Sequence, residues 1–327
     1  MNRRPTPHPA RPQGLGSCLV FGLPSGLPSG PASVFPSGLA LGLAVGLTSG
    51  LVLAAPGLDA QQSQRIDMTD FPRPIEAVDN VWIEELTMPE VRDALQAGMT
   101  NVLILAGGVE ENGPYLTTGK HNHVLKVMGE SIARRMGNTL VAPILTIEPG
   151  NPANQTTPGS IRISQATYRA MLTDVATSLK TQGFRNIFMM GDSGGNQAGQ
   201  REVAEELNAA WGDDGVGVYY IPEYYSYGEI LRYQNEVMGV AETQYSEGFH
   251  DNYYITSMIL LDDPRHVRFE ERVRAGKASI NGISLVPLEK SLWHGRQLVE
   301  YRTDLTVEGM RRAMAGTASE LEAEPEA

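Results

Sequence analysis

Short apolar runs alternate with amphipathic stretches along most of the chain, from residue 66 to residue 316. The apolar runs lie at 101–105, 139–145, 186–190 and 215–222. Stretches with helical spacing of apolar side chains lie before and between them, at 88–98, 125–136, 165–183 and 200–210. This order predicts an α/β domain of three layers over residues 61–316, in which helices cover both faces of a mostly parallel sheet.

Two glycine-rich segments follow apolar runs of this pattern, one after 101–105 and one after 186–190. Their polar side chains include Glu110, Asn112, Asp192, Ser193 and Asn196. Ligands of open α/β sheets bind outside the carboxyl ends of the parallel strands, so these side chains are expected to face one cavity. The pattern predicts a site and leaves its chemistry open.

The first part of the chain, residues 1–60, has a different composition. It carries three arginines against one acidic residue, and an apolar stretch at 38–55 is followed by small residues. A basic start, an apolar stretch and small residues are the three parts of a secretory signal. We therefore expect export, to the periplasm or the cell exterior, with cleavage after Ala55 or Ala60. A single membrane anchor is the alternative.

Charge narrows the possible partners. Residues 1–60 carry a net charge of +2, so their removal changes the formal charge from −12 to −14 and also removes the single cysteine, Cys18. No disulfide can form in that mature chain, and its acidity argues against nucleic acid or an anionic membrane as the partner. The acidic segment 317–327, with Leu321 as its one large apolar side chain, is expected to be disordered.

Several tyrosines follow the last apolar run. The stretch 223–234 holds four of them, Tyr224, Tyr225, Tyr227 and Tyr233. Tyrosine combines apolar area with a polar tip, so this group can form the wall of a substrate pocket or an oligomer interface. Ordinary packing is the alternative.

Four segments carry a family resemblance. They are GGVEENGPYLTTGKHN at 107–122, PGSIR at 158–162, GDSGGN at 191–196 and HDNYYITS at 250–257. In this order they resemble the signatures of the creatininase (creatinine amidohydrolase) family of metal-dependent hydrolases. The resemblance implies the creatininase fold, which commonly assembles into hexamers, and cleavage of a carbon–nitrogen bond in a small amide. A homo-oligomer is therefore expected.

The chain departs from these signatures at the residues that hold the family's two metal ions. Glu110 keeps its position as a ligand. Asn112 stands where the family has a histidine, His121 where it has the metal-bridging aspartate, Ser193 where it has a second histidine, and Ile255 where it has a glutamate. Neutral amide and hydroxyl oxygens are poor ligands for an ion such as zinc, which puts the two-metal centre in doubt.

A replacement set of ligands is available beside these losses. Glu110, His121 and Asp192 are predicted to hold one divalent ion, either zinc, iron or manganese, with an open position for water. By resemblance, His250 is the candidate general acid or base, and a buried structural histidine is the alternative. The pocket itself is expected to be shaped by Asn112, Gly194, Gly195 and Asn196.

The segment GDSGG at 191–195 also spells the nucleophile loop of trypsin-like serine proteases. Those enzymes are all-β barrels, whereas this segment lies between a strand and a helix, so that interpretation is rejected. Ser193 remains a candidate nucleophile if a histidine reaches it. The alternative is that Ser193 caps the following helix.

Together these features predict an exported, metal-dependent amidohydrolase that acts on a small molecule. The second hypothesis is a catalytically inert binding protein that kept the pocket and lost the metal ions. The four substituted positions favour the binding protein, and the new His121 and Asp192 favour the enzyme. The residues do not identify the substrate.

Overall fold

Four parallel strands form the central sheet, in the order β2–β1–β5–β6. Their bounds are Asn101–Ala106 for β1, Thr139–Val141 for β2, Asn186–Gly191 for β5 and Gly217–Tyr220 for β6. The register pairs Ala106 with Gly191, so β1 and β5 end side by side at their carboxyl ends. Every residue of β1 is buried, as expected for a parallel strand that is covered on both faces.

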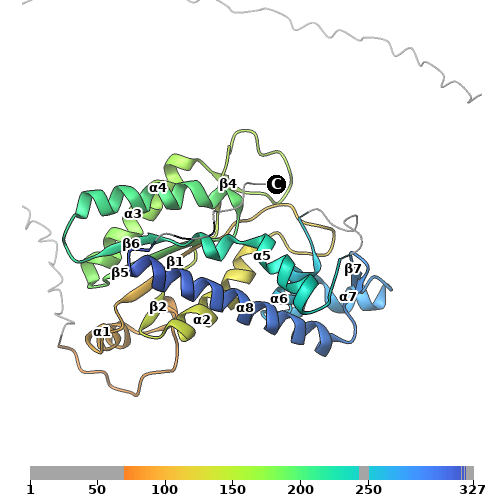
Figure 1. Ribbon diagram of the computed structural model, residues 1–327, viewed down its shortest axis with the longest axis horizontal. Coiled ribbons are helices and arrows are strands. Elements are labelled where there is room, and N and C mark those ends of the chain that lie inside the picture. Colours follow the sequence, from red (N-terminus) through yellow and green to blue (C-terminus); the bar gives the residue numbers. More distant parts are fainter. Residues whose placement is uncertain (1–69, 243–249, 318, 320, 322–327) are drawn as a thin grey trace, which may run out of the picture. The chain divides into compact units, whose positions relative to one another are not determined.

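Helices cover both faces of this sheet in the computed structural model, which describes residues 70–242, 250–317, 319 and 321 (Figure 1). On one face, Leu103 and Leu105 of β1 join a core cluster with side chains from α2 (Lys120–Met136), α6 (Tyr253–Ile259) and α8 (Leu288–Met314). On the other face, Val102 and Ile104 join a second cluster with side chains from α3 (Gln165–Gln182) and α4 (Gly194–Trp211).

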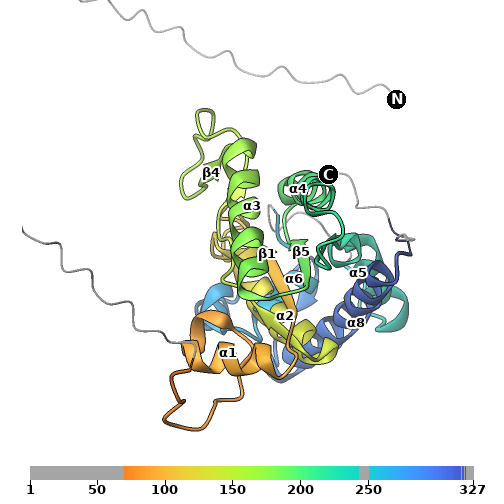
Figure 2. The same cartoon turned by 90° about the vertical axis from the view of Figure 1, so that its left-hand side faces the viewer.

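Figure 2, turned by 90°, shows the same division, with α3 and α4 on one side of β1 and β5 and with α2 and α8 on the other. Alternate side chains of a strand point to opposite faces, so a fully apolar strand fills both clusters. The predicted three-layer α/β fold with a mostly parallel sheet is confirmed.

Shorter elements connect this framework. The helical ones are η1 (Ile83–Glu85), α1 (Met88–Gln96), η2 (Pro222–Tyr225), α5 (Tyr227–Arg232), η3 (Tyr233–Val237), η4 (Pro264–Val267) and α7 (Phe269–Arg274). The short strands are β3 (Glu148–Pro149), which pairs in parallel with β4 (Arg162–Ile163), and β7 (Ser279–Ile280), which pairs antiparallel with β8 (Ile283–Ser284).

Two helices begin earlier than the apolar spacing predicts, and both changes move site residues. The helix predicted over 125–136 begins at Lys120, which places His121 and His123 in its first turns. The helix predicted over 200–210 begins at Gly194, directly after Ser193. These first turns are rich in polar residues and glycine, so their hydrophobic periodicity is absent although the backbone is helical.

The expected export signal over residues 1–60, including Cys18, lies outside the described residues, as does most of the acidic segment 317–327. Within the described part of the chain, no helix combines the length and the apolar character needed to cross a membrane.

Candidate functional site

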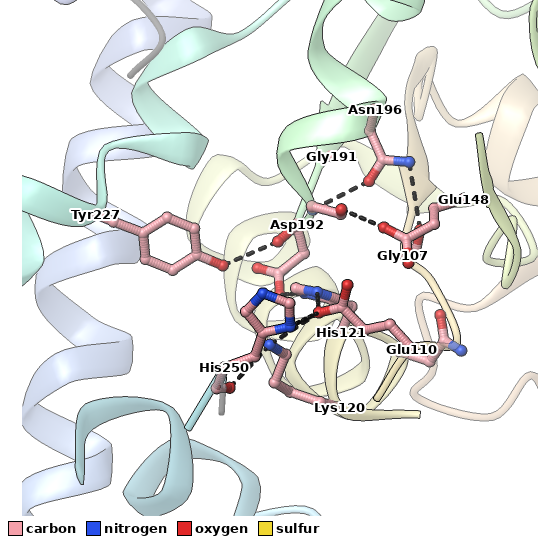
Figure 3. A network of polar contacts seen from close by, with 12 residues as sticks. Gly107, Glu110, Lys120, His121, Glu148, Gly191, Asp192, Asn196, Tyr227 and His250 are labelled. Atoms are coloured by element: carbon pink, nitrogen blue, oxygen red, sulfur yellow. Dashed lines mark hydrogen bonds and ion pairs between the residues drawn. The ribbon is translucent and has the colours of Figure 1, made fainter. Parts of the chain in front are cut away.

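The loops that leave the carboxyl ends of β1 and β5 meet the start of α2 and the β3–β4 pair around a pocket of about 630 Å³. Glu110 follows β1, His121 lies in the first turn of α2, and Asp192 and Ser193 follow β5. Figure 3 shows the side chains of Glu110, His121 and Asp192 converging on one network of polar contacts. The sheet topology therefore brings the three predicted ligands together in space.

His121 lies between two carboxylates. Its Nε2 is 2.7 Å from Glu110 Oε1, and its Nδ1 is 2.8 Å from Asp192 Oδ2 (Figure 3). Burial and the nearby Lys120 ammonium oppose protonation of the ring, but the hydrogen bonds to Asp192 and Glu110 prevail and raise the pKa of His121 above its usual value. We interpret His121 as an imidazolium that donates a hydrogen bond from each ring nitrogen.

The imidazolium form of His121 makes the stability of the fold depend on pH. A group with a raised pKa in the folded state stabilises the fold at low pH, so the contribution of His121 is expected to be complete below about pH 6.5. It is expected to decrease as the pH rises through the higher pKa of the folded state. Urea unfolding at a series of pH values checks this, and the His121→Gln variant should lack that part of the pH dependence. An identical pH dependence in the variant would contradict a charged ring.

Asp192 is fully buried and held by residues that are distant in the sequence. Its Oδ1 accepts hydrogen bonds from Arg302 Nη2 and from the Tyr224 hydroxyl, both at 2.9 Å. The Arg302 guanidinium also lies over the Tyr224 ring, 4.0 Å from its centroid, and Tyr227 donates to the Asp192 backbone carbonyl at 2.9 Å. Burial alone would raise the pKa of Asp192, but Arg302 and His121 lower it below its ordinary value. Asp192 is therefore a buried anion with two cationic neighbours.

Two further cations contact Glu110. Lys120 Nζ lies 3.0 Å from Glu110 Oε1 and donates to the backbone carbonyl of His250, also at 3.0 Å. Arg162 Nη2 lies 3.2 Å from Glu110 Oε2, and Arg162 Nη1 contacts Glu148. Although burial opposes ionisation of Glu110, hydrogen bonding to His121 and the charge of Lys120 lower its pKa. Glu110 is therefore ionised and surrounded by positive charge.

Glu148 completes the network. It is fully buried in β3, and its carboxylate accepts a hydrogen bond from the Ser193 hydroxyl. Burial and the nearby charge of Glu110 raise the pKa of Glu148, although Ser193, His121 and Arg162 act in the opposite direction. Ser193 also forms a capping box with Asn196 at the start of α4. The hydroxyl thus caps the helix and faces a carboxylate at the same time.

The other predicted site residues have different positions. His250 has a half-exposed side chain at the pocket, with Nδ1 3.6 Å from Glu110 Oε1 and 3.2 Å from the Glu111 carbonyl. Gly194 and Gly195 line the pocket. Asn112 instead braces its own loop, because its Nδ2 donates to the carbonyls of Glu110 and Thr117.

Asn196 is buried and joins two loops. Its Oδ1 accepts from the Ser193 backbone N–H at 3.0 Å, and its Nδ2 donates to the Gly107 carbonyl at 3.3 Å (Figure 3). Asn196 therefore links the loop that follows β1 to the loop that follows β5. The catalytic, binding and metal-binding roles predicted for all these residues stay predictions.

Comparison with known proteins identifies the family. The family model for creatininase, described as creatinine amidohydrolase, matches residues 84–316. The chain therefore belongs to the creatininase family, as the four sequence segments predicted.

Several solved structures of creatininases are similar to this chain. A crystal structure of creatinine amidohydrolase (creatininase) is 21% identical, covers 73% of this chain and 98% of its own, and has a TM-score of 0.48. A structure described as creatininase Mn is 20% identical over 72% and 98%, with a TM-score of 0.48. A creatininase variant of Zn-Zn type is 19% identical over 73% and 98%, with a TM-score of 0.49. A search of curated proteins gave no match.

Family membership suggests a metal-dependent amidohydrolase, and donors of the right type are present. One ligand atom each of Glu110, His121 and Glu148 lies within 4.8 Å of the others. In contrast, Asp192 contacts the ring nitrogen of His121 that is not bonded to Glu110, so the predicted set of Glu110, His121 and Asp192 surrounds the imidazole rather than one point.

The family's two-ion centre does not fit this arrangement. Asn112 is turned into its loop, Ser193 is bonded to Glu148, and both ring nitrogens of His121 are bonded to carboxylates. The charge of the network also disfavours a single divalent ion. The three carboxylates of the network already face four cations, which are Lys120, Arg162, Arg302 and the His121 imidazolium. A divalent ion would add two uncompensated charges in a buried site.

Sequence reasoning missed four members of this network. Lys120, Glu148, Arg162 and Arg302 lie in or against the site, and two of them had a local signal. Lys120 is adjacent to His121, and Arg162 ends the second family segment. Arg302 had no local signal in the sequence, because it lies in α8, 110 positions from Asp192.

Proposed function

We propose that the protein is an exported hydrolase of the creatininase family that cleaves a carbon–nitrogen (amide) bond in a small molecule. The observation that carries this proposal is the pairing of an acid and a base in the pocket region. His121 and Glu148 both have raised pKa values, and a nitrogen of His121 lies within 4.8 Å of a Glu148 oxygen. A protonated imidazole beside a carboxylate with a raised pKa suits general acid–base catalysis near neutral pH.

The side chains divide the chemical roles. Glu148 accepts a proton from the attacking group, which is water or the Ser193 hydroxyl that already donates to it. His121 releases Glu110 and delivers its Nε2 proton to the leaving nitrogen, while Asp192 holds the ring through Nδ1. The Lys120 and Arg162 cations stabilise negative charge on the carbonyl oxygen in the transition state. His250, with Nδ1 3.6 Å from Glu110, is the second candidate for proton transfer.

The pocket suits a small polar substrate. Its volume of about 630 Å³ is in the range of small-molecule sites. Tyr225, Tyr227 and Tyr254 supply apolar area along its lining, and Asn151 and Gln155 supply polar groups. Two of the tyrosines singled out in the sequence thus line this pocket, while Tyr233 stacks on Tyr301, with ring centroids 4.0 Å apart.

A specific observation also favours the second function, a binding protein without catalysis. Every carboxylate of the network faces a cation of the chain, so no bound ion is needed to neutralise the carboxylates. Such a site can bind a small polar molecule by exchanging some of these contacts and perform no chemistry on it.

One experiment tests the proposal. The mature chain is incubated with a panel of small linear and cyclic amides, with and without a strong chelator. Turnover is expected to persist with the chelator, because the site's donors are already paired with Lys120 and Arg162. Activity that disappears with the chelator and returns with zinc or manganese would contradict this metal-independent chemistry. Binding of a panel member without turnover would support the second function.

A further inference from the structure

A second cluster of metal-binding side chains lies outside the network around His121. It consists of His123 in α2, Asp262 after α6, and His266 in η4. We propose that these three side chains form a site for a divalent cation of the zinc class, which joins the start of α2 to η4. Two imidazoles and a carboxylate are a donor set that zinc commonly takes.

The distances within this cluster carry the argument. Asp262 Oδ2 lies 3.2 Å from His123 Nδ1 and 3.3 Å from His266 Nε2. Around a tetrahedral zinc ion with bonds of about 2.0–2.1 Å, neighbouring ligand atoms are separated by about 3.3–3.4 Å. Charge-assisted hydrogen bonds between a ring nitrogen and a carboxylate are commonly shorter, about 2.7–2.9 Å, and N–H···O bonds in general extend to about 3.2 Å.

The network around His121 provides an internal comparison. There the two contacts from ring nitrogens to carboxylates are 2.7 and 2.8 Å, which are hydrogen-bond distances. The same pair of groups is therefore about 0.5 Å farther apart at Asp262, and the longer separation matches ligands that share a cation.

The two imidazoles of the cluster lie next to each other. The imidazoles of His123 and His266 are stacked, with centroids 3.5 Å apart and an interplanar angle of 17°. A cation shared with Asp262 would hold both rings beside one carboxylate oxygen, Oδ2.

The surroundings leave room for a further ligand. The side chains of His123 and His266 are 21% and 28% exposed, so water can reach a fourth position. Lys126 Nζ lies 3.4 Å from the other carboxylate oxygen, Asp262 Oδ1, but the Lys126 side chain is 62% exposed and free to move into solvent. Lys126 is thus a weak competitor for the carboxylate rather than a barrier to the ion.

The proposed site has a structural role. His123 lies two residues after His121, and the His266 carbonyl accepts a hydrogen bond from Thr117 N–H at 2.9 Å. The segment that carries Lys120 and His121 is therefore tied to η4 on both sides. A cation at Asp262 would stabilise this segment without taking part in the chemistry of the pocket, so the inference does not depend on the proposed function.

Zinc titration of the chelator-treated protein tests the site, by calorimetry and by competition with a coloured chelator. One zinc ion per chain is expected to bind, and the apparent melting temperature is expected to rise with zinc. Asp262→Asn and His266→Gln are each expected to weaken binding by more than about 100-fold, since even indirect partners of a metal contribute 10–100-fold. Lys126→Gln is the matched control, and it should bind zinc equally or more tightly.

A Glu110→Gln variant separates this site from the pocket. Zinc binding that survives in Glu110→Gln and is lost in Asp262→Asn supports the proposal. Binding that is lost in Glu110→Gln and kept in Asp262→Asn overturns it and places the ion in the pocket. The absence of zinc binding in the folded wild-type chain, or equal affinity in all variants, overturns it as well.

Discussion

Replacement of Arg302 by methionine is expected to lower the free energy of unfolding by about 3–5 kcal/mol. Arg302 and Asp192 are both fully buried, and their charged groups are 2.9 Å apart. Methionine retains much of the apolar volume but leaves the Asp192 carboxylate without its strongest positive neighbour. The cost arises from this uncompensated charge and from the Tyr224 carbonyl, which loses the hydrogen bonds from Arg302 at 2.9 and 3.0 Å.

Urea unfolding of four variants, Arg302→Met, Asp192→Asn, the double variant and Arg296→Met, measures this effect. Arg296→Met is the matched control, because Arg296 lies on the same helix with an exposed side chain, and it should change stability by less than about 0.5 kcal/mol. In the double variant Asp192→Asn/Arg302→Met the buried anion is absent, so the loss should be smaller than the sum of the two single losses. Additive losses would show that the ion pair is not the source of the effect.

Replacement of His121 by glutamine is expected to reduce turnover of the amide substrate by about 10²–10⁴-fold, the usual contribution of general acid–base catalysis. Glutamine preserves a polar side chain between Glu110 and Asp192 but has no proton to transfer near neutral pH. The reduction should appear mainly in kcat, with a smaller change in KM, because the proposed proton transfer occurs in the transition state.

Glu130→Gln is the control for this prediction, since Glu130 lies on α2 with an exposed side chain and should leave kcat unchanged. The pH dependence of kcat gives a second readout. Loss of the alkaline limb in His121→Gln would assign that limb to the imidazole. Turnover within a few-fold of the wild-type value in His121→Gln would exclude His121 as the proton donor and leave His250 as the candidate.

Local patterns predicted the layers of this fold but not the beginnings of its helices. The apolar runs at 101–105 and 186–190 became β1 and β5, because a strand buried on both faces must be apolar throughout. The polar first turn of α2, which holds Lys120 and His121, carries no such periodicity, so the apolar spacing predicted a helix only from residue 125. Their helical position follows from packing of the later turns, such as Val124 and Leu125, against the sheet.

The candidate site, like the fold, was predictable from the sequence only in part. Loops at the carboxyl ends of neighbouring strands must converge, so the meeting of Glu110, His121 and Asp192 was predictable from their places after β1 and β5. The partners of these residues were not. Glu148 follows a short stretch without clear periodicity, and Arg302 comes from α8, whose position under the sheet depends on the whole core cluster.

By itself, the sequence determined the family, the three-layer α/β fold and the departure from the family's metal ligands, since apolar periodicity and short motifs are local properties of the chain. Only the tertiary structure decided which charges face each other. The fold places Lys120 and Arg162 beside Glu110, and Arg302 beside Asp192. The interaction energy of buried charges depends on the distance between them, and these groups come from distant parts of the chain.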